Sequence, residues 1–333
     1  KKMLTNSVKG RVLDYSRVVG GRAFRGIAYA TLGDGDDVYI VTRDTYGSGI
    51  LKITIGAEID DEEEVLSFSN ICEGIFDHSW PTCAAFNGGK LYVTDELKNC
   101  VSIFNSEGYR IKEFGRLGSN IGEFDRPSGI AIAPDNNIFV ADTLNHRIQK
   151  FSPDGELIIQ FGSHGREEDQ LDSPWGMSLD GSGNLLVADH LNNRVQRFSS
   201  DGEHMDTFGK EGTEAETLDH PTDITVDPDG DIYVSDWAND RVQLYDEKGT
   251  HLTSLNGAAS DLSKWQQQYV SSNPDVYKAR RRVATLEPEK HFALPVGVAY
   301  DAKKSRLLVV DSQRWRIQIF DKLKNYSEPQ FNI

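Results

Sequence analysis

Six short segments of the chain end in an aspartate, and in one of them the residue before that aspartate is a long cation. The residues at this position are Arg43, Thr94, Ala141, Ala188, Ser235 and Val310. A guanidinium where the other segments have compact side chains needs a carboxylate, a carbonyl or a ligand anion beside it, because an unpaired buried charge is costly. Arg43 is therefore the first candidate for binding a carboxylate or an oxyanion. The alternative is a structural ion pair, for instance with Asp44.

A second set of candidates has the side chains of metal binding and proton transfer. Another short segment precedes each of these six, and in five cases it begins with a proline; in the first, Phe24 takes its place. Two residues after this beginning stand Gly26, Cys83, Gly129, Gly176, Asp223 and Gly297. Asp223 and Cys83 thus place polar atoms where the others have none, and His78 and His220 lie close to them in sequence. These residue types can bind a divalent ion such as zinc or calcium, or transfer a proton. Polar side chains that only bridge channel water are the alternative.

Large aromatic and charged side chains also gather next to these prolines and aspartates. Tryptophans at such places either cap a core or form the wall of a ligand pocket. We predict the wall of a pocket, whose ligand-binding residues are Trp80, Trp175, Trp237, Glu96 and Arg314. The predicted catalytic residues beside them are Arg43, His190, His220 and Asp223.

The elements that carry these residues repeat along the chain. Asp95, Asp142, Asp189 and Asp236 stand at intervals of 47 residues and close the phrases LYVTD, IFVAD, LLVAD and IYVSD. Each unit alternates short β-branched or aromatic runs with turn pairs, which predicts four antiparallel strands, here a to d. Four-stranded units repeated at this period are typical of a β-propeller. We expect the aspartates to cap the turns between strands b and c.

The geometry of such a unit brings the candidates together. Strands a and b form an antiparallel hairpin, so the beginning of a and the end of b lie at the same end of the blade. All the prolines, the aspartates and the b–c turns therefore meet on one face around the central channel, the top face.

The chain resembles the NHL-repeat family. The resemblance rests on RIQKF at Arg147, RVQRF at Arg194 and RVQLY at Arg241, together with VADTLNHR and RPSG. It implies a six-bladed propeller over essentially the whole chain, residues 1–333, as a single domain. Some relatives bind RNA on one face of the propeller, but a net charge of −16 repels phosphate backbones.

Among NHL-like propellers, the chain is similar in one respect to the peptidyl-hydroxyglycine amidating lyases. Those enzymes have a catalytic arginine at the end of a b strand in the first blade, where Arg43 stands here. They also have zinc-binding histidines after three of the prolines, and here the residues in that position are Thr82, Ser128, Trp175, Thr222 and Val296. The zinc triad is missing, so the resemblance carries over Arg43 and not the lyase activity.

Two departures from the repeat are informative. The segment from Val12 to Gly20 matches a d strand, so we predict that it closes the last blade and removes an open seam. Residues 257–288 interrupt the repeat between the fifth and sixth units. We predict two helices there, the first capped by Ser260 and the second opened by Pro274. They would emerge on the top face, either as a lid over the pocket or as an insertion that only packs against the propeller.

The composition of the chain indicates its cellular location and the kind of partner that it binds. Lys1 to Gly10 has no apolar segment typical of a signal peptide, and no run approaches the ~20 residues needed to cross a bilayer. Three cysteines favour free thiols and a cytoplasmic location over a disulfide framework. We therefore expect a monomer that binds a small molecule or a peptide and neither nucleic acid nor membrane.

Two functions remain open from the sequence. In the first, the propeller binds a small anionic or carbonyl-bearing ligand in the top-face pocket and acts as a lyase or hydrolase. Arg43 would hold the oxyanion, and His190, His220 or Asp223 would handle a proton or a metal. In the second, the propeller is a non-catalytic scaffold that binds a protein or peptide.

Overall fold

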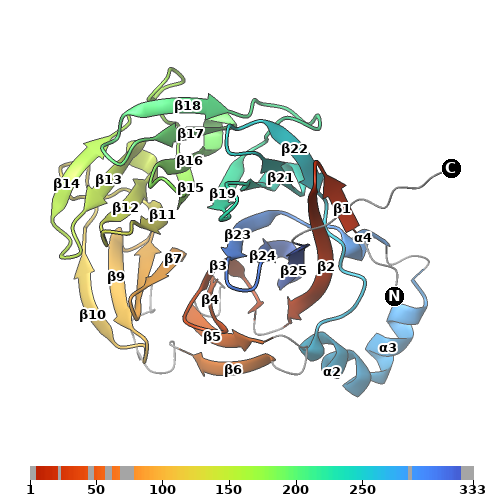
Figure 1. Ribbon diagram of the computed structural model, residues 1–333. Coiled ribbons are helices and arrows are strands. Elements are labelled where there is room, and N and C mark those ends of the chain that lie inside the picture. The colour runs from red at the N-terminus through yellow and green to blue at the C-terminus, as the bar shows by residue number, and fades with distance from the viewer. Residues whose placement is uncertain are drawn as a thin grey trace.

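Six β-sheets stand in a ring around a central axis (Figure 1). The computed structural model describes residues 5–21, 24–43, 49–56, 62–67, 79–283 and 287–323. Within each sheet the neighbouring strands are antiparallel, as in the third blade. The chain therefore folds as the predicted six-bladed propeller of antiparallel blades.

The first five blades follow chain order from the axis to the rim. The first comprises β3 (Ile27–Leu32), β4 (Asp37–Thr42), β5 (Gly49–Ile55) and β6 (Glu62–Ser67). The second comprises β7 (Pro81–Asn87), β8 (Lys90–Asp95), β9 (Cys100–Asn105) and β10 (Arg110–Phe114). The third comprises β11 (Pro127–Ile132), β12 (Ile138–Asp142), β13 (Arg147–Phe151) and β14 (Leu157–Phe161). The fourth comprises β15 (Pro174–Leu179), β16 (Leu185–Asp189), β17 (Arg194–Phe198) and β18 (His204–Phe208). The fifth comprises β19 (Pro221–Val226), β20 (Ile232–Asp236), β21 (Arg241–Tyr245) and β22 (His251–Leu255).

The sixth blade joins the two ends of the chain. Its order is β23 (Pro295–Asp301), β24 (Arg306–Asp311), β25 (Arg316–Leu323), β2 (Arg11–Gly20) and β1 (Thr5–Val8). Strand β2 pairs with β25 from Val12 opposite Leu323 to Gly20 opposite Arg316, which confirms the predicted closure. The sheet has five strands where the repeat predicts four, because β1 folds back on β2 as a hairpin.

The core lies between adjacent blades, and this explains the two sequence patterns in each unit. Every residue of β12 and β16 is buried, since inner strands are covered on both faces. Strand β14 alternates between half-buried and exposed residues, because one face of an outer strand meets water. Phe139 of the third blade and Met177 of the fourth pack in one such interblade cluster.

The recurring aspartates stabilise the blades in a way that differs from the predicted turn caps. Asp142 accepts hydrogen bonds from Arg147 Nε at 2.7 Å and from the Asp125 N–H at 2.7 Å, and its side chain makes no capping bond to the turn. The same aspartate–arginine pair recurs in the next three blades. Of the recurring aspartates in blades two to six, Asp95 alone caps its turn as predicted, because it accepts N–H groups of the turn residues. Cys100 lies opposite Asp95 in the sheet, at the position where the other four blades have an arginine.

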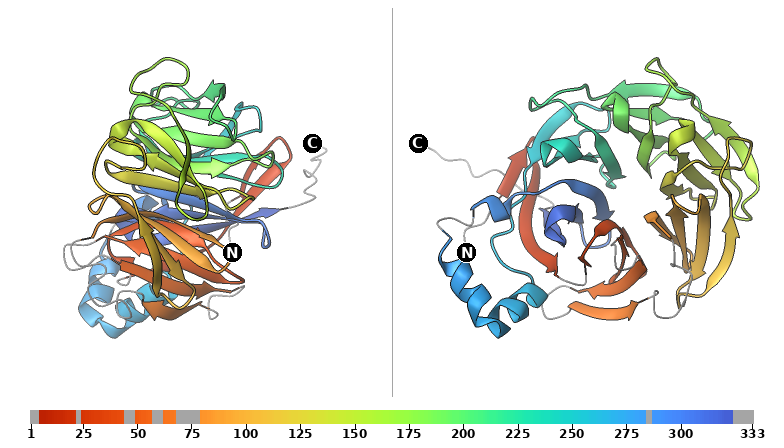
Figure 2. Two further views of the ribbon diagram at one scale, coloured as in Figure 1. Left: turned by 90° about the vertical axis from the view of Figure 1, so that its left-hand side faces the viewer. Right: turned by 180° about the vertical axis from the view of Figure 1, so that it is seen from behind.

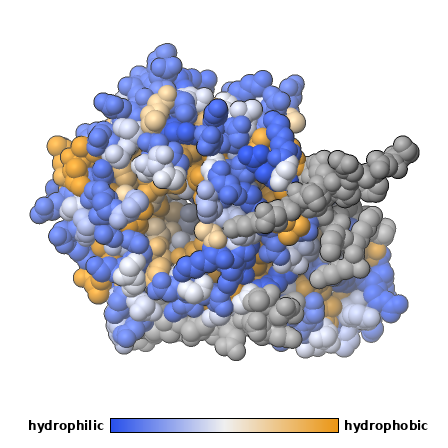
Figure 3. Space-filling view, viewed as in Figure 1, coloured by the Kyte–Doolittle hydropathy of each residue, from blue (hydrophilic) through white to orange (hydrophobic). Residues whose placement is uncertain are grey.

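The face of the a–b turns, the bottom face, holds a buried lysine. Lys322 Nζ lies 2.5 Å from Asp227, 2.8 Å from Asp229 and 2.9 Å from Asp231. The sequence DPDGD around these aspartates looks like a fragment of a calcium loop, and the ammonium group takes the place of the cation. The bottom face is mainly hydrophilic around a central hollow (Figure 3).

The insertion between the fifth and sixth blades lies at the rim. It contains α2 (Lys264–Ser272), α3 (Pro274–Arg281) and the short α4 (Glu287–Lys290). Ser263 caps α2 in a capping box with Gln266, so the prediction of Ser260 as the cap was wrong; Pro274 begins α3 as predicted. Trp265 packs edge-on against Phe24 with a centroid distance of 5.8 Å.

The position of α2 and α3 shows where the predicted lid lies relative to the central cavity. Figures 1 and 2 show α2 and α3 outside the ring beside β2, away from the axis. None of the described residues of the insertion lines the central cavity of the top face. No helix in the described part of the chain is long and apolar enough to cross a membrane.

Candidate functional site

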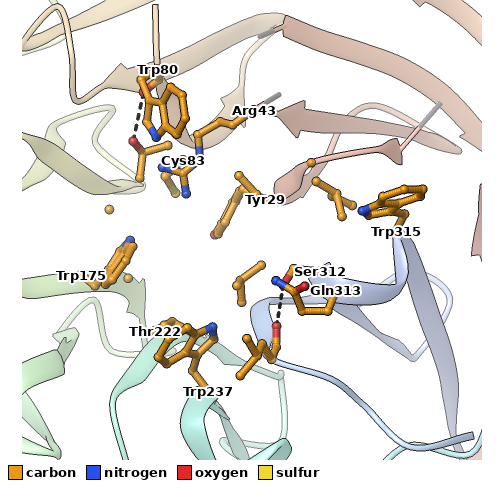
Figure 4. A pocket seen from close by; sticks show the side chains of 18 residues that line it. Tyr29, Arg43, Trp80, Cys83, Trp175, Thr222, Trp237, Ser312, Gln313 and Trp315 are labelled. Carbon is orange, nitrogen blue, oxygen red and sulfur yellow. Dashed lines mark hydrogen bonds between the residues drawn. The ribbon is translucent and has the colours of Figure 1, made fainter. Parts of the chain in front are cut away.

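A cavity of about 380 Å³ opens on the top face at the mouth of the channel (Figure 4). All six blades contribute to its lining, among others through Arg43, Thr82, Gly129, Trp175, Thr222 and Gln313. The inner strands lie close together at the glycine positions. A Cβ atom on Gly129 would lie 2.0 Å from the Trp175 carbonyl oxygen.

Four tryptophans line the cavity. Trp80, Trp175 and Trp237 line the cavity as predicted, and Trp315 joins them. Trp315 was not predicted from the sequence, although a signal was present. It ends the b–c turn of the sixth blade in a left-handed conformation, at the position that holds Asn99, His146, Asn193 and Asp240 in the preceding blades.

The register of the first blade corrects the predicted alignment. Ile27 pairs with Thr42 as Pro81 pairs with Asp95, so Ile27 rather than Phe24 takes the place of the proline. Arg43 is then the counterpart of Glu96, and the predicted equivalence with Thr94 was wrong.

Arg43 reaches the cavity from the residue after β4. Its guanidinium lies 5.6 Å from the centre of the Trp80 ring, and its Nη1 lies 3.8 Å from Glu96 Oε2. The alternative partner Asp44 lies outside the described residues. Burial lowers the pKa of Arg43, against the field of Glu96, and burial also raises the pKa of Glu96. At 3.8 Å the two charges attract each other without a hydrogen bond, so the guanidinium donors are directed by packing rather than by Glu96.

Tyr29 and Cys83 line the floor of the cavity, and the buried Asp223, which does not line it, contacts Tyr29. The Tyr29 hydroxyl lies 3.5 Å from Asp223 Oδ1, and the Val298 N–H donates to Asp223 Oδ2 at 2.9 Å. Tyr29 lines both this cavity and the hollow of the bottom face, so it separates the two halves of the channel. Tyr29 pairs with Val41, as Cys83 pairs with Thr94 and Asp223 with Ser235 in their blades. Tyr29 therefore stands at the position that the sequence alignment assigned to Gly26, and for this reason its contact with Asp223 was missed.

Burial changes the pKa values of the groups at the floor of the cavity. Burial raises the pKa of Asp223 to about 8, although its hydrogen bonds oppose the shift. Burial also raises the pKa of the Cys83 thiol to about 12. At neutral pH Tyr29, Cys83 and the Asp223 behind them therefore all retain their protons.

His190 and His220 lie in a layer next to the tryptophans. The His190 ring is 4.6 Å from Trp175 and 5.0 Å from His220, and neither histidine is among the lining residues. Nδ1 of His190 donates to the Pro221 carbonyl at 3.1 Å, and burial lowers the pKa of His190 to about 4. His220 Nδ1 lies 2.5 Å from Asp219 Oδ1. The pair thus orients Trp175 and Trp237.

The predicted metal ligands His220 and Asp223 do not converge on one point, because each pairs with a different residue. His220 pairs with Asp219 and Asp223 with Tyr29, while His78 lies outside the described residues. Arg314 lies 3.9 Å from Asp311 and does not line the cavity. Within the described ranges, the group of metal-ligand side chains that does converge is His146, His164 and Asp172, at the junction of the third and fourth blades.

The geometry supports binding chemistry and proton transfer. The guanidinium can bind a carboxylate or a carbonyl oxygen that becomes negative, and the tryptophan faces can hold an apolar or ring-shaped group. The Tyr29 hydroxyl, backed by the protonated Asp223, can donate a proton to a bound group.

Comparisons with known proteins agree with this architecture. A family model for the NHL repeat matches residues 124–151, 171–198 and 218–245, the first three strands of blades three to five. No curated protein sequence matches the chain significantly.

Solved propellers have the same fold at low sequence identity. A streptogramin B lyase is 14% identical with a TM-score of 0.57, over 92% of this chain and 97% of its own. A gluconolactonase from Xanthomonas campestris is 13% identical with a TM-score of 0.58, over 95% and 91%. A protein of unknown function from Bacteroides thetaiotaomicron is 15% identical with a TM-score of 0.63, over 90% and 70%. The chain is thus a six-bladed β-propeller that carries NHL repeats in its third, fourth and fifth blades.

Proposed function

We propose that the top-face cavity binds a small molecule with an anionic or carbonyl group against Arg43 and an apolar ring between the tryptophans. One observation carries the proposal. Among the described residues that line the cavity there is an arginine and four indole N–H donors but no carboxylate, in a chain of net charge −16. Arginine and tryptophan side chains only donate hydrogen bonds, so this lining favours a ligand that accepts them.

The chemistry proposed for this site is that of a lyase or hydrolase. Arg43 stabilises negative charge on a carbonyl oxygen, and Tyr29 with Asp223 supplies a proton. Two of the structural neighbours are a lyase and a lactonase, which supports catalysis on a small molecule. Because these neighbours are under 16% identical, their substrates are not transferred.

Binding of matched probes tests the proposal. Benzoate, benzamide and benzylamine share a ring and differ in charge, so their affinities, measured by tryptophan fluorescence or calorimetry, report what the cavity selects. We expect benzoate to bind most tightly and Arg43→Ala to weaken it by about 2–4 kcal/mol, as for truncation of one partner of a buried charge pair. Arg126→Ala is the control, because it removes an exposed nearby cation that does not line the cavity. Equal benzoate affinity in Arg43→Ala, or a preference for benzylamine, would contradict the proposal.

Turnover is tested separately with an aryl acetate and an aryl-substituted lactone. Tyr29→Phe keeps the ring that separates the two halves of the channel and removes the hydroxyl. If Tyr29 donates the proton, kcat for a substrate that is turned over falls by about 100-fold or more while the benzoate affinity is kept. An unchanged kcat would remove Tyr29 from the catalytic role.

A protein- or peptide-binding function is the second candidate. It is favoured by three leucines at the same position of successive b–c turns on the top face, Leu97, Leu144 and Leu191, with exposures of 57%, 44% and 41%. A peptide that binds there would depend on these leucines and not on Arg43. Triple substitution to serine and the Arg43→Ala variant thus separate the two functions in one binding assay.

A further inference from the structure

The junction of the third and fourth blades has a group of side chains that the central cavity does not use. His146 ends the b–c turn after β12, His164 lies in the connection between β14 and β15, and Asp172 lies two residues before the proline that begins β15. His146 and Asp172 are half-buried, and the His164 side chain is 66% exposed. The three come from separate segments of the chain, so their convergence is a product of the fold.

The distances within this group are those of ligand atoms around one ion. His146 Nδ1 lies 3.4 Å from Asp172 Oδ1, and His164 Nε2 lies 3.6 Å from Asp172 Oδ2. Ligand atoms at 2.0–2.2 Å from a tetrahedral zinc ion are about 3.3–3.6 Å apart. One ligand atom from each residue lies within 4.8 Å of the others, so the exposed His164 needs a small rotation to complete the site.

Comparison among the repeats shows that this combination is specific to one junction. The residues at the three equivalent positions are Asn99, Leu117 and Asp125 one blade earlier, and Asn193, Glu211 and Asp219 one blade later. The aspartate is common to all three junctions, while the two imidazoles occur together in one. The structural role of the turn position, which accepts an N–H from the next blade, is performed by Asn99 and Asn193 as well as by His146. That role therefore does not account for the histidines.

A metal ion at this junction would compete with one hydrogen bond of His146. His146 Nδ1 accepts the Ser173 N–H at 3.1 Å, so a metal on this nitrogen replaces one hydrogen bond. The two imidazole rings lie 4.2 Å apart, so both can face one ion.

We propose that His146, His164 and Asp172 bind one divalent transition-metal ion, zinc in the first instance. Two imidazoles and one carboxylate suit zinc rather than calcium or magnesium, which prefer oxygen ligands. Three protein ligands leave a coordination position for water on the exposed side. The ion joins the b–c turn of the third blade to the beginning of the fourth, and it stabilises the native state because the unfolded chain does not bring these residues together.

The test uses tag-free full-length protein treated with a chelator and titrated with zinc in a calorimeter. We expect one zinc per chain, an upward shift of the melting temperature with zinc, and no comparable shift with calcium or magnesium. Cobalt substitution gives the visible absorption of a tetrahedral site with nitrogen and oxygen ligands. No zinc binding, or an equal shift with calcium, would overturn the proposal.

Variants locate the site. His164→Asn changes an exposed side chain, so the fold should tolerate it, and it should weaken zinc binding by more than about 100-fold, beyond the loss seen for partners outside the ligand shell. Asp172→Asn should act in the same direction. His204→Asn, on the outer strand β18, is the matched control and should bind zinc like the wild type. Wild-type affinity in His164→Asn would overturn the assignment.

Discussion

Two cations, Lys322 on the bottom face and Arg43 on the top face, have very different surroundings. Lys322 is 5% exposed and has carboxylate oxygens at 2.5, 2.8 and 2.9 Å. Arg43 is 20% exposed and has one carboxylate at 3.8 Å. The first cation is saturated by hydrogen bonds and joins the closing blade to the fifth. The second can still bind an oxyanion, so the number and distance of partners, rather than charge alone, separate a structural cation from a candidate binding group.

The largest effect is expected from removing the strands that close the ring on the side of Lys322. Deletion of residues 1–21 takes away β1 and β2, leaves β25 as an unpaired edge and removes Arg11, which donates to Asp231 at 2.7 Å. We expect aggregation or loss of the cooperative melting transition. The measurement is thermal denaturation with light scattering. A truncated protein as stable as the full chain would refute the importance of the closure.

Lys322→Met tests the saturated cation directly. The variant leaves the buried Asp227 and Asp231 with less positive charge, and we expect a loss of about 3–5 kcal/mol in the free energy of unfolding, as for a buried pair broken at one partner. Urea denaturation gives the value. Lys303→Met, which removes an exposed lysine, should change stability little. If both variants lose the same amount, the network around Lys322 contributes nothing specific.

The stability contributed by Asp223, the buried partner of Tyr29, should depend on pH. Its pKa is raised to about 8 in the folded protein by burial, against about 3.9 in an unfolded chain. The folded state therefore keeps a proton that the unfolded state releases, and this contribution to stability is full below about pH 4 and is lost as the pH rises to about 8. Asp223→Asn lacks this loss, so its stability relative to wild type should rise between pH 5 and 8 in urea denaturation. Parallel pH profiles of the two proteins would contradict the shifted pKa.

Arg43→Ala should have the smallest effect on stability. Its carboxylate partner Glu96 is partly exposed at 3.8 Å, so we expect a change within about 1 kcal/mol in urea denaturation, as for loosely paired surface charges. Arg43→Lys should restore little of the benzoate affinity, because an ammonium group cannot form the bidentate contact. A loss of about 3–5 kcal/mol in Arg43→Ala would instead place Arg43 beside Lys322 as a structural cation.

Much of the fold could be predicted from the sequence, because each repeat encodes its strands locally. The period, the turn pairs and the prolines predicted six blades, the closing strand and the second helix of the insertion. They also predicted the face on which Arg43, Trp80, Trp175 and Trp237 meet. Errors arose where a local pattern had two solutions. Both Ser260 and Ser263 can cap a helix, and Gln266 makes Ser263 the better cap through the reciprocal bond of a capping box.

The sequence by itself determined that an aspartate stands among glycines and that two histidines fall in one junction. It did not determine the register of the first blade, which makes Arg43 the counterpart of Glu96. Only the tertiary structure decided which of these meet, because contacts between blades join residues that are far apart in the chain. Glu96 faces Arg43 across a blade boundary, and Tyr29 reaches Asp223 across the channel. His220 lies with Asp219 rather than with Asp223, because its N–H is held by Asn193 of the preceding blade and its ring turns toward its neighbour in the chain.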